Sequence, residues 1–211
     1  MTLSRRAVLA GGAGLGMIAL SGVALTLLRH PAGAEGLTLD DVIGDPDQPV
    51  LGNPEGDVTV VEFFDYQCPF CKRGHSDLLA EVSDDGNARL VMKDWPIFGG
   101  ASVLASQLVL GAVNTDQYAH AQNALMATPA RLSEQDVRDT LAGAGLDPDS
   151  LYASYLQERS RWDGLLGRNS QQAVAIGLQG TPAYNIGQSM YPGAMERSRL
   201  RDAIAHARNE A

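Results

Sequence analysis

The apolar positions of this chain first form a clear pattern at residues 58–64, which read Val-Thr-Val-Val-Glu-Phe-Phe. A short run of β-branched and aromatic residues is typical of a buried strand. After it, Leu78 and Val82 have the spacing of one face of a helix over residues 72–82. Residues 88–95 form a second apolar run. We therefore predict a βαβ unit with parallel strands and a right-handed crossover.

From residue 102 to about residue 176 the apolar positions follow a helical repeat. Ser133 with Asp136 three residues later matches a capping box. Asp147 followed by Pro148 matches a helix start with proline in its first turn. The sequence therefore predicts a helical insertion over residues 102–176.

β structure resumes after this insertion. Residues 183–187 predict a short strand, and a turn leads from it to Met190 and Tyr191. Residues 195–208 predict a last helix. Ahead of the first strand, residues 35–57 are rich in proline and glycine and predict a turn-rich lead-in. The pattern as a whole belongs to the α/β class.

The first residues indicate an export signal at residues 1–34. Ser4-Arg5-Arg6 stands before a long uncharged stretch rich in glycine, alanine and leucine. This start resembles a twin-arginine signal, and the general secretory route stays open as an alternative. A small-residue pattern ends at Ala34, so we expect cleavage after that residue.

An uncleaved membrane anchor is the alternative for this segment. Residues 7–28 are uncharged, and their number is close to the roughly 20 residues that cross a bilayer. Their glycines make the stretch weakly apolar, which favours removal. In both cases the folded part lies in the periplasm or another extracytoplasmic space, where disulfides form and persist.

The chain is acidic, with 16 lysines and arginines against 25 aspartates and glutamates and a net charge of −9. Removal of the signal makes the charge more negative, because residues 1–34 contain arginines and no acidic residue. Such a surface argues against nucleic acid and anionic membranes as partners. The sequence contains no phosphate-binding glycine loop, serine triad or paired metal ligands, so no cofactor and no metal are expected.

The two cysteines of the chain, Cys68 and Cys71, enclose Pro69 and Phe70 and follow the first strand. Cys68 is therefore expected where the next helix begins, and there the unpaired amides and the helix dipole favour an anion. A thiolate is such an anion. The pKa of Cys68 should then lie well below the unperturbed value of about 8.5, which predicts thiol chemistry near neutral pH.

Two other uses of the pair compete with redox exchange. A zinc or copper site needs more ligands, and the chain has no second Cys-x-x-Cys and no histidines in paired spacing among His75, His120 and His206. A structural disulfide across two residues would close a very short loop and remove little entropy from the unfolded chain. Redox exchange is the favoured interpretation, and metal handling stays open.

Three motifs resemble the DsbA-like family of bacterial disulfide oxidoreductases. They are EFFDYQCPFC at residues 62–71, GTPAY at 180–184 and YPGA at 191–194. The resemblance covers nearly all of residues 50–208. It implies a thioredoxin-like fold in which residues 58–101 and 177–211 are two parts of one domain and residues 102–176 are an inserted helical subdomain.

The resemblance also implies roles for the residues of these motifs. Cys68 would be the exposed nucleophile that forms a mixed disulfide with substrate, and Cys71, deeper in the helix, would resolve it. Pro182 would be a cis proline facing the cysteine pair, because the cis form of a peptide bond costs little free energy only before proline. The backbone of Thr181 would hydrogen-bond an extended substrate chain.

A buried carboxylate beneath the pair and a lysine that pairs with it are further features that the resemblance implies, here Glu62 and Lys93. Glu62 would relay the proton of Cys71, and Lys93 would offset its charge. An ion pair that merely orders two strands is the alternative. Asp65 is expected to be a solvated loop residue.

For substrate binding, the resemblance implies an apolar groove around Phe70, Pro182 and Tyr184. Strongly oxidising members often carry histidine where this chain has Phe70, so we expect a less oxidising disulfide here. His75 is expected to be an exposed helix residue without a catalytic role.

The sequence thus predicts an exported thiol-disulfide oxidoreductase that forms or exchanges disulfides in unfolded or partly folded exported proteins. A membrane redox partner would restore its cysteine pair. A disulfide isomerase or reductase with the same pair is the alternative within this class. Outside this class of enzymes, the alternatives are a copper- or zinc-handling protein and a chaperone that acts through the apolar groove. The short lead-in leaves no room for a dimerisation domain, so a monomer is expected.

Overall fold

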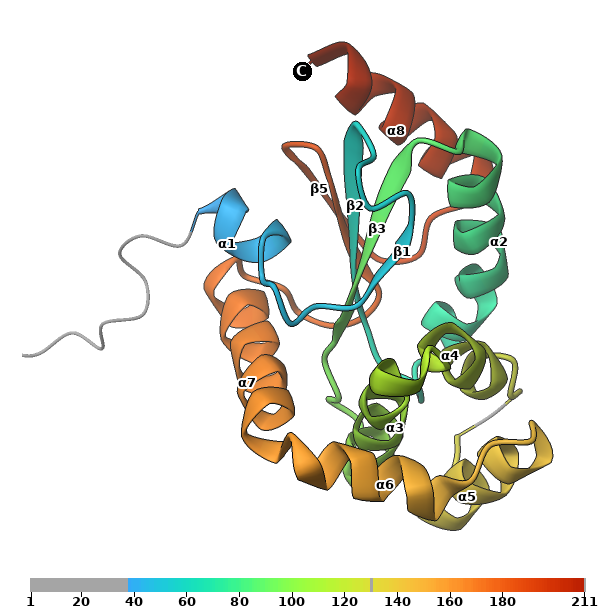
Figure 1. Ribbon diagram of the computed structural model, residues 1–211. Helices are drawn as coiled ribbons and strands as arrows, with labels where there is room; N and C mark the ends of the chain where they lie inside the picture. The colour runs from blue at the N-terminus through green and yellow to red at the C-terminus, as the bar shows by residue number, and fades with distance from the viewer. Residues whose placement is uncertain (1–37, 130, 211) are drawn as a thin grey trace, which may run out of the picture. The chain divides into compact units, whose positions relative to one another are not determined.

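A computed structural model describes residues 38–129 and 131–210 of the chain (Figure 1). The predicted export signal and its cleavage position after Ala34 lie outside these residues. Across the two described ranges, no helix has both the length and the apolar character that crossing a membrane requires.

The described residues form a mixed sheet with the strand order β1-β3-β2-β4-β5. The strands are β1 (Val50–Gly52), β2 (Val58–Phe64), β3 (Ala88–Asp94), β4 (Ala183–Ile186) and β5 (Ser189–Pro192). β2 and β3 are parallel, and the other neighbouring pairs are antiparallel. Because helix α2 (Pro69–Asp85) connects β2 to β3, the predicted unit of two parallel strands and a helix is confirmed.

Both faces of the sheet are covered by helices. Helices α2 and α8 (Arg197–Glu210) lie on one face, and α1 (Leu39–Ile43) and α7 (Arg159–Ala175) lie on the other (Figure 1). Side chains of β2 alternate between two hydrophobic clusters, with Val60 and Phe64 in one and Val61 and Phe63 in the other. Burial on both faces explains why this strand reads as an apolar run without alternation.

The lead-in before β2 has more regular structure than the sequence predicts. Thr38 and Asp41 form a capping box at the start of α1, and β1 pairs with β3 at the edge of the sheet. These two elements have five and three residues. Elements this short are below the length at which a hydrophobic period can be recognised.

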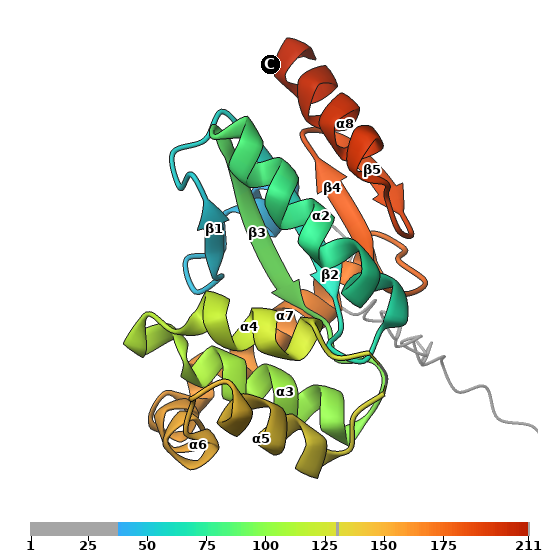
Figure 2. The same cartoon turned by 90° about the vertical axis from the view of Figure 1, so that its right-hand side faces the viewer.

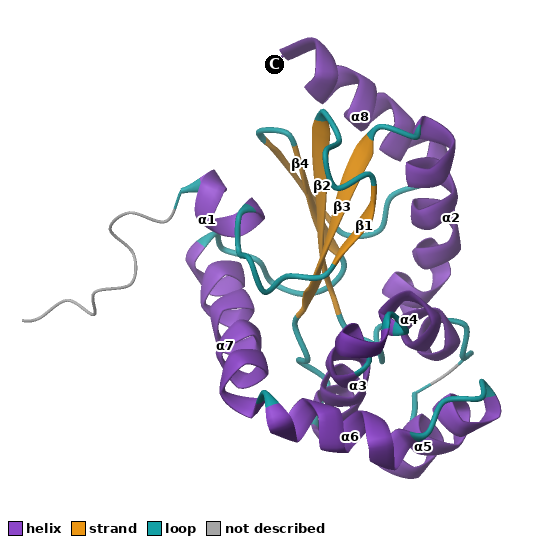
Figure 3. Ribbon diagram, viewed as in Figure 1, coloured by secondary structure: helices purple, strands orange, loops and turns teal. Residues whose placement is uncertain are grey.

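The predicted helical insertion is present between β3 and β4. Its helices are α3 (Gly100–Gly111), the short 3₁₀ helix η1 (Val113–Thr115), α4 (Tyr118–Met126), α5 (Glu134–Gly143), α6 (Pro148–Gln157) and α7. Helices α3 to α6 lie beyond one end of the strands (Figures 2 and 3). The capping box of Ser133 and Asp136 and the Asp147 cap before Pro148 are both confirmed.

The last helix starts two residues later than predicted. Met195 is buried and contributes to the core from the loop before α8, which is why its apolar character extended the predicted helix. Helix α8 packs along α2, where Arg197 and Arg201 both pair with Glu81. These contacts hold the terminal helix over the helix that carries the cysteines.

Candidate active site

Cys68 is the N-cap residue of α2, and Cys71 is the third residue of that helix. Cys68 has an extended backbone (φ −72°, ψ 117°), and Pro69 occupies the first helical position. Proline fits there because the amide it lacks would have no partner within the helix. The backbone amides of Phe70 and Cys71 hydrogen-bond the Cys68 sulfur and favour its ionised form. The predicted position of Cys68 at a helix start is confirmed.

The two thiols of this pair differ sharply in acidity. A hydrogen bond from the Cys71 thiol, aided by Thr181 and the helix amides against the effect of burial, lowers the pKa of Cys68 to about 6. Burial raises the pKa of Cys71 far above its ordinary value, and the bond to Cys68 and the charge of Glu62 add to this effect. At neutral pH Cys68 is therefore a thiolate while Cys71 keeps its proton.

Cys68 is covered in the structure, although an exposed nucleophile was expected. Cys68 is 1% exposed and Cys71 is fully buried, and both are free thiols. The Sγ atom of Cys68 lies 3.1 Å from the carbonyl oxygen of Thr181. The expectation was wrong because the Thr181-Pro182 segment packs against the sulfur. The peptide bond between these two residues is cis, as predicted.

Glu62 is fully buried next to the cysteines. Its Oε1 atom accepts a hydrogen bond from the Tyr184 hydroxyl at 3.2 Å, and Oε2 has no partner among the described residues. Burial raises the pKa of Glu62 to about 8, with the Tyr184 bond acting in the opposite direction. A carboxyl group in this position holds a proton at neutral pH and lies close enough to influence the pKa of Cys71.

Tyr184 does not line a substrate groove. It is 1% exposed and lies opposite Glu62 in the pairing of β2 with β4, so its side chain shares the buried face of that residue. The expected contact of Tyr184 with substrate is therefore wrong, because strand alternation points this ring inward. Phe70, in contrast, is 52% exposed.

The expected ion pair between Glu62 and Lys93 does not form. In the register of β2 and β3, Met92 lies opposite Glu62 and Lys93 lies opposite Phe63. Because neighbouring residues of a strand point to opposite faces, Lys93 faces away from the cysteine pair. The Lys93 prediction is thus wrong for a reason of register, since it assumed that both side chains lie on one face.

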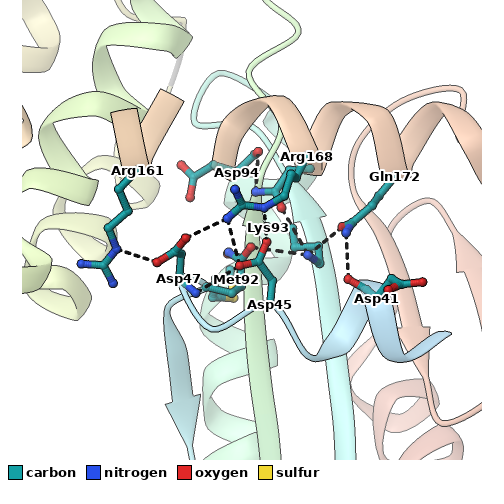
Figure 4. A network of polar contacts seen from close by, with 11 residues as sticks. Asp41, Asp45, Asp47, Met92, Lys93, Asp94, Arg161, Arg168 and Gln172 are labelled. Carbon is teal, nitrogen blue, oxygen red and sulfur yellow. Dashed lines mark hydrogen bonds and ion pairs between the residues drawn. The ribbon is translucent and has the colours of Figure 1, made fainter. Parts of the chain in front are cut away.

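Lys93 is instead enclosed by amide groups on the face covered by α7 (Figure 4). It is fully buried, and its Nζ atom donates to Gln172 at 2.8 Å, to Asn169 at 3.2 Å and to Gln48 at 3.4 Å. Burial lowers the pKa of Lys93 to about 8. Gln48 comes from the lead-in and the other two amides come from α7. The lysine therefore joins three segments of the chain.

Ion pairs extend this network over the lead-in (Figure 4). Arg168 of α7 binds Asp45 through two nitrogens at 2.6 and 3.0 Å. Asp47 accepts from Arg168 at 2.9 Å and from Arg161 at 2.7 Å. Lys93 and these pairs hold residues 45–48 against α7, which is a structural role away from the thiols.

Asp65 is a buried residue that organises the loop before Cys68, although a solvated position was expected. It is 1% exposed. Its carboxylate accepts from the backbone amides of Gln67, Ile97 and Phe98 and from the Ser102 hydroxyl, at 2.6, 2.7, 3.1 and 2.7 Å. The expectation failed because three of these donors come from beyond β3. The bond to Gln67 is a local Asx turn, which is a signal that the sequence carries.

His75 is buried, so the expectation of an exposed helix residue is wrong. It is 5% exposed, and its Nε2 atom lies 2.7 Å from the Asn123 Oδ1 atom of α4. Burial lowers the pKa of His75. Helix α4 covers this face of α2, and its packing could not be anticipated from the pattern of α2 alone.

Asp94 is a further buried acid near the site, and the sequence analysis did not identify it. It is 1% exposed at the end of β3, and burial raises its pKa to about 7 while the nearby Ser106 hydroxyl opposes the shift. A charged residue inside the apolar run of residues 88–95 was the available signal. Despite these acids, no three His, Cys, Asp or Glu side chains of the described residues are arranged to hold a metal ion.

Comparison with known proteins gives the family. Residues 59–205 match the protein family described as the DSBA-like thioredoxin domain. A local segment of 49 residues is 49% identical to disulfide bond formation protein D of Bacillus subtilis (strain 168). This match spans 22% of the present chain and 22% of the Bacillus protein.

Solved structures give matches over most of the chain. A thioredoxin-like oxidoreductase from Silicibacter pomeroyi DSS-3 is 37% identical, with a TM-score of 0.78 over 83% of this chain and 100% of the other. The thiol-disulfide exchange protein alpha-DsbA2 from Wolbachia pipientis is 27% identical, with a TM-score of 0.73 over 79% and 90%. A periplasmic thioredoxin-like protein from Salmonella enterica serovar Typhimurium is 26% identical, with a TM-score of 0.69 over 81% and 95%.

The family match covers well over half of the chain, and the solved structures superpose on most of it. The predicted fold class is confirmed. The chain therefore belongs to the DSBA-like thioredoxin domain family of thiol-disulfide oxidoreductases.

Proposed function

We propose that this protein forms or exchanges disulfide bonds in other exported proteins, with Cys68 and Cys71 as its redox pair. The observation that carries the proposal is the contrast between the two thiols. Cys68 is acidic at the start of α2, whereas Cys71 is buried and keeps its proton. Such an unequal pair is suited to attack at one sulfur and resolution by the other.

In the oxidising direction, a substrate thiolate attacks the Cys68 sulfur of the oxidised pair. The Cys68–Cys71 bond breaks, a mixed disulfide forms between substrate and Cys68, and Cys71 leaves as a thiolate. Glu62 retains a proton below about pH 8, and in this proposal it supplies that proton to Cys71. Cys68 is covered in the reduced structure, so the Thr181-Pro182 segment has to yield when substrate binds.

The second substrate thiolate then attacks the substrate sulfur of the mixed disulfide. The substrate disulfide forms, and Cys68 leaves as a thiolate, so two electrons pass from the substrate to the enzyme. A thiol with a low pKa leaves readily. The low pKa of Cys68 also stabilises the reduced enzyme, which favours oxidation of substrates over reduction.

An extracytoplasmic location and a membrane redox partner belong to this proposal. The reduced pair must be reoxidised before another turnover, and the periplasmic description of the Salmonella relative supports the location. The predicted signal at residues 1–34 has the same implication. If the partner supplies electrons instead, the same residues act as a reductase or isomerase.

The direct test is oxidation of reduced, unfolded ribonuclease by the oxidised protein in stoichiometric amounts. We expect ribonuclease activity to return as the enzyme becomes reduced. Cys68→Ser should abolish this transfer. With scrambled, disulfide-bonded ribonuclease as substrate, Cys71→Ser should accumulate a mixed disulfide, because its Cys68 thiolate attacks a substrate disulfide, a substrate thiolate leaves, and no Cys71 thiol remains to resolve the product. Full transfer by Cys68→Ser would contradict the assigned roles.

The direction of electron flow has its own measurement. Equilibration of the Cys68/Cys71 pair with glutathione gives its potential, and trapping of thiols in cells gives its redox state. A pair that is oxidised in cells indicates disulfide formation. A pair that is reduced in cells indicates an isomerase or reductase.

A further inference from the structure

A cavity of about 750 Å³ lies between α2 and α4, immediately beside the cysteine pair. Pro69, which follows Cys68 directly, lines the cavity at the first turn of α2. Leu79 lines it nearly three turns further along this helix, and Met126 and Pro129 line it from the end of α4 and the loop after it. Its size falls within the range of ligand pockets, roughly 300–1,000 Å³.

The charge of this cavity is opposite to that of the protein. Lys72 and Arg73 line it, and among the described residues around it none is acidic. The whole chain has a net charge of −9. Two other cavities of about 470 Å³ differ in this respect, because each includes at least two aspartates. A cationic cavity on an acidic protein attracts anionic groups selectively.

Contacts between the two helices hold the walls of the cavity in place. Lys72 Nζ donates to the Thr128 hydroxyl at 2.7 Å, and the Thr128 hydroxyl in turn donates to the Leu125 carbonyl at 2.6 Å. One turn along α2, His75 pairs with Asn123 at 2.7 Å. Both α2 residues therefore bind α4 or the residues directly after it, so the cavity exists without a ligand.

An exposed aromatic ring connects the cavity with the reacting sulfur. Phe70 is 52% exposed, and the Arg73 guanidinium lies 4.4 Å from the centre of its ring. Phe70 lies between the two cysteines in sequence, and Arg73 lines the cavity. A polypeptide whose cysteine reacts at Cys68 could therefore place the residues next to that cysteine over Phe70 and into the cavity.

We propose that this cavity binds the segment of a client polypeptide next to its reacting cysteine and selects segments that combine acidic with apolar side chains. Carboxylates would pair with Arg73 and Lys72, and apolar side chains would contact Leu79, Met126 and the two prolines. This inference rests on the proposed function, because it assigns part of the client specificity of that reaction.

The test compares two dithiol peptides with the same cysteines and leucines, one with aspartates and one with lysines beside the first cysteine. The rate at which the oxidised protein oxidises each peptide is divided by the rate at which the same protein oxidises dithiothreitol. We expect the acidic peptide to react faster by a factor on the order of five at low salt, and the preference to disappear at high salt. Equal rates for both peptides would overturn the inference.

Two charge-reversal variants separate the cavity from the general charge of the protein. Arg73→Glu should cancel or reverse the preference for the acidic peptide. Arg199→Glu changes an exposed arginine of α8 outside the cavity and should keep it. Loss of the preference to the same extent in both variants would show a long-range charge effect and contradict a binding site.

Equilibrium binding distinguishes this inference from the proposed reaction. Fluorescence anisotropy of labelled, cysteine-free versions of the two peptides requires no thiol exchange. Preferential binding of the acidic peptide, lost in Arg73→Glu, supports the cavity even if ribonuclease is not oxidised. Reduced glutathione serves as a competitor, and displacement of the acidic peptide at equimolar glutathione would overturn the assignment to a polypeptide.

Discussion

The Cys68 sulfur lies 3.1 Å from the carbonyl oxygen of Thr181, a residue 113 positions further along the chain. The Thr181 hydroxyl is also close and favours the ionised form of Cys68, and it makes no standard hydrogen bond within the described residues. One residue thus contacts the thiol through its carbonyl and has a hydroxyl available for the thiolate. The acidity of Cys68 therefore depends on the loop before β4 as well as on α2.

Thr181→Val tests the contribution of this hydroxyl. Valine keeps the shape of threonine but cannot donate a hydrogen bond to the thiolate. Since such a bond contributes about 1 kcal/mol, we expect the pKa of Cys68 to rise by about one unit or less. Thr181→Ser, which keeps the hydroxyl, should leave the value near that of the wild type. The thiolate absorbance at 240 nm, followed against pH in the reduced proteins, measures both.

Glu62 should make the stability of the protein fall as pH rises. Its pKa is raised from an ordinary 4.5 to about 8, so the folded protein keeps a proton that the unfolded chain has released between these values. The stabilisation is therefore complete below about pH 4.5 and is lost as the pH approaches 8. Relative to Glu62→Gln, the free energy of unfolding should decrease by up to about 1.4 kcal/mol per pH unit.

Urea denaturation of the oxidised proteins at several pH values measures this difference, because the oxidised state removes the titration of Cys68. Glu55→Gln is the matched control, since Glu55 is exposed in the loop before β2. This variant gives the effect of the same substitution at an exposed position. A wild-type stability that runs parallel to Glu62→Gln from pH 5 to pH 8 would show that Glu62 is not protonated in the folded protein.

Lys93 should matter for stability and not for thiol reactivity. Lys93→Met removes the buried donor to Gln172, Asn169 and Gln48 and leaves their amide oxygens without it. Each unpaired buried group costs about 1–3 kcal/mol, so we expect a clear loss in the free energy of unfolding. The rate of Cys68 alkylation at pH 7 should stay at the wild-type value. A large change in that rate would instead support the coupling to Glu62 that the sequence suggested.

Asp65 should stabilise the loop that presents Cys68. Asp65→Asn places an amide group among the amide donors of Gln67, Ile97 and Phe98, where a carboxylate accepts from all three. We expect a loss of about 1–3 kcal/mol in the free energy of unfolding. Asp77→Asn changes an exposed aspartate of α2 and should stay within about 0.5 kcal/mol of the wild type. Equal stability of both variants would show that these loop contacts do not form in solution.

The local parts of the fold followed from the sequence. The apolar run of β2, the caps of α5 and α6 and the position of Cys68 at the start of α2 each depend on a few neighbouring residues. The cis bond before Pro182 followed from the family motif. These features needed no knowledge of which distant segments pack together.

The wrong predictions concern side chains whose surroundings are set by packing between distant parts of the chain. Lys93 and Glu62 lie on opposite faces because of the register between β2 and β3, which neither strand reveals alone. His75 is buried because α4 packs on α2, and Asp65 is buried because the loop after β3 supplies its donors. Sequence patterns identified these side chains as candidates, but their surroundings depend on the fold.

The most direct test of the redox assignment is the pH dependence of alkylation in the reduced wild-type protein, with the modified residue identified by mass spectrometry. We expect iodoacetamide to label Cys68 alone, with a half-maximal rate near pH 6, while Cys71 stays unlabelled across the range. Labelling of both cysteines with a midpoint at the ordinary thiol value, about 8.5, would contradict a redox pair with an ionised Cys68.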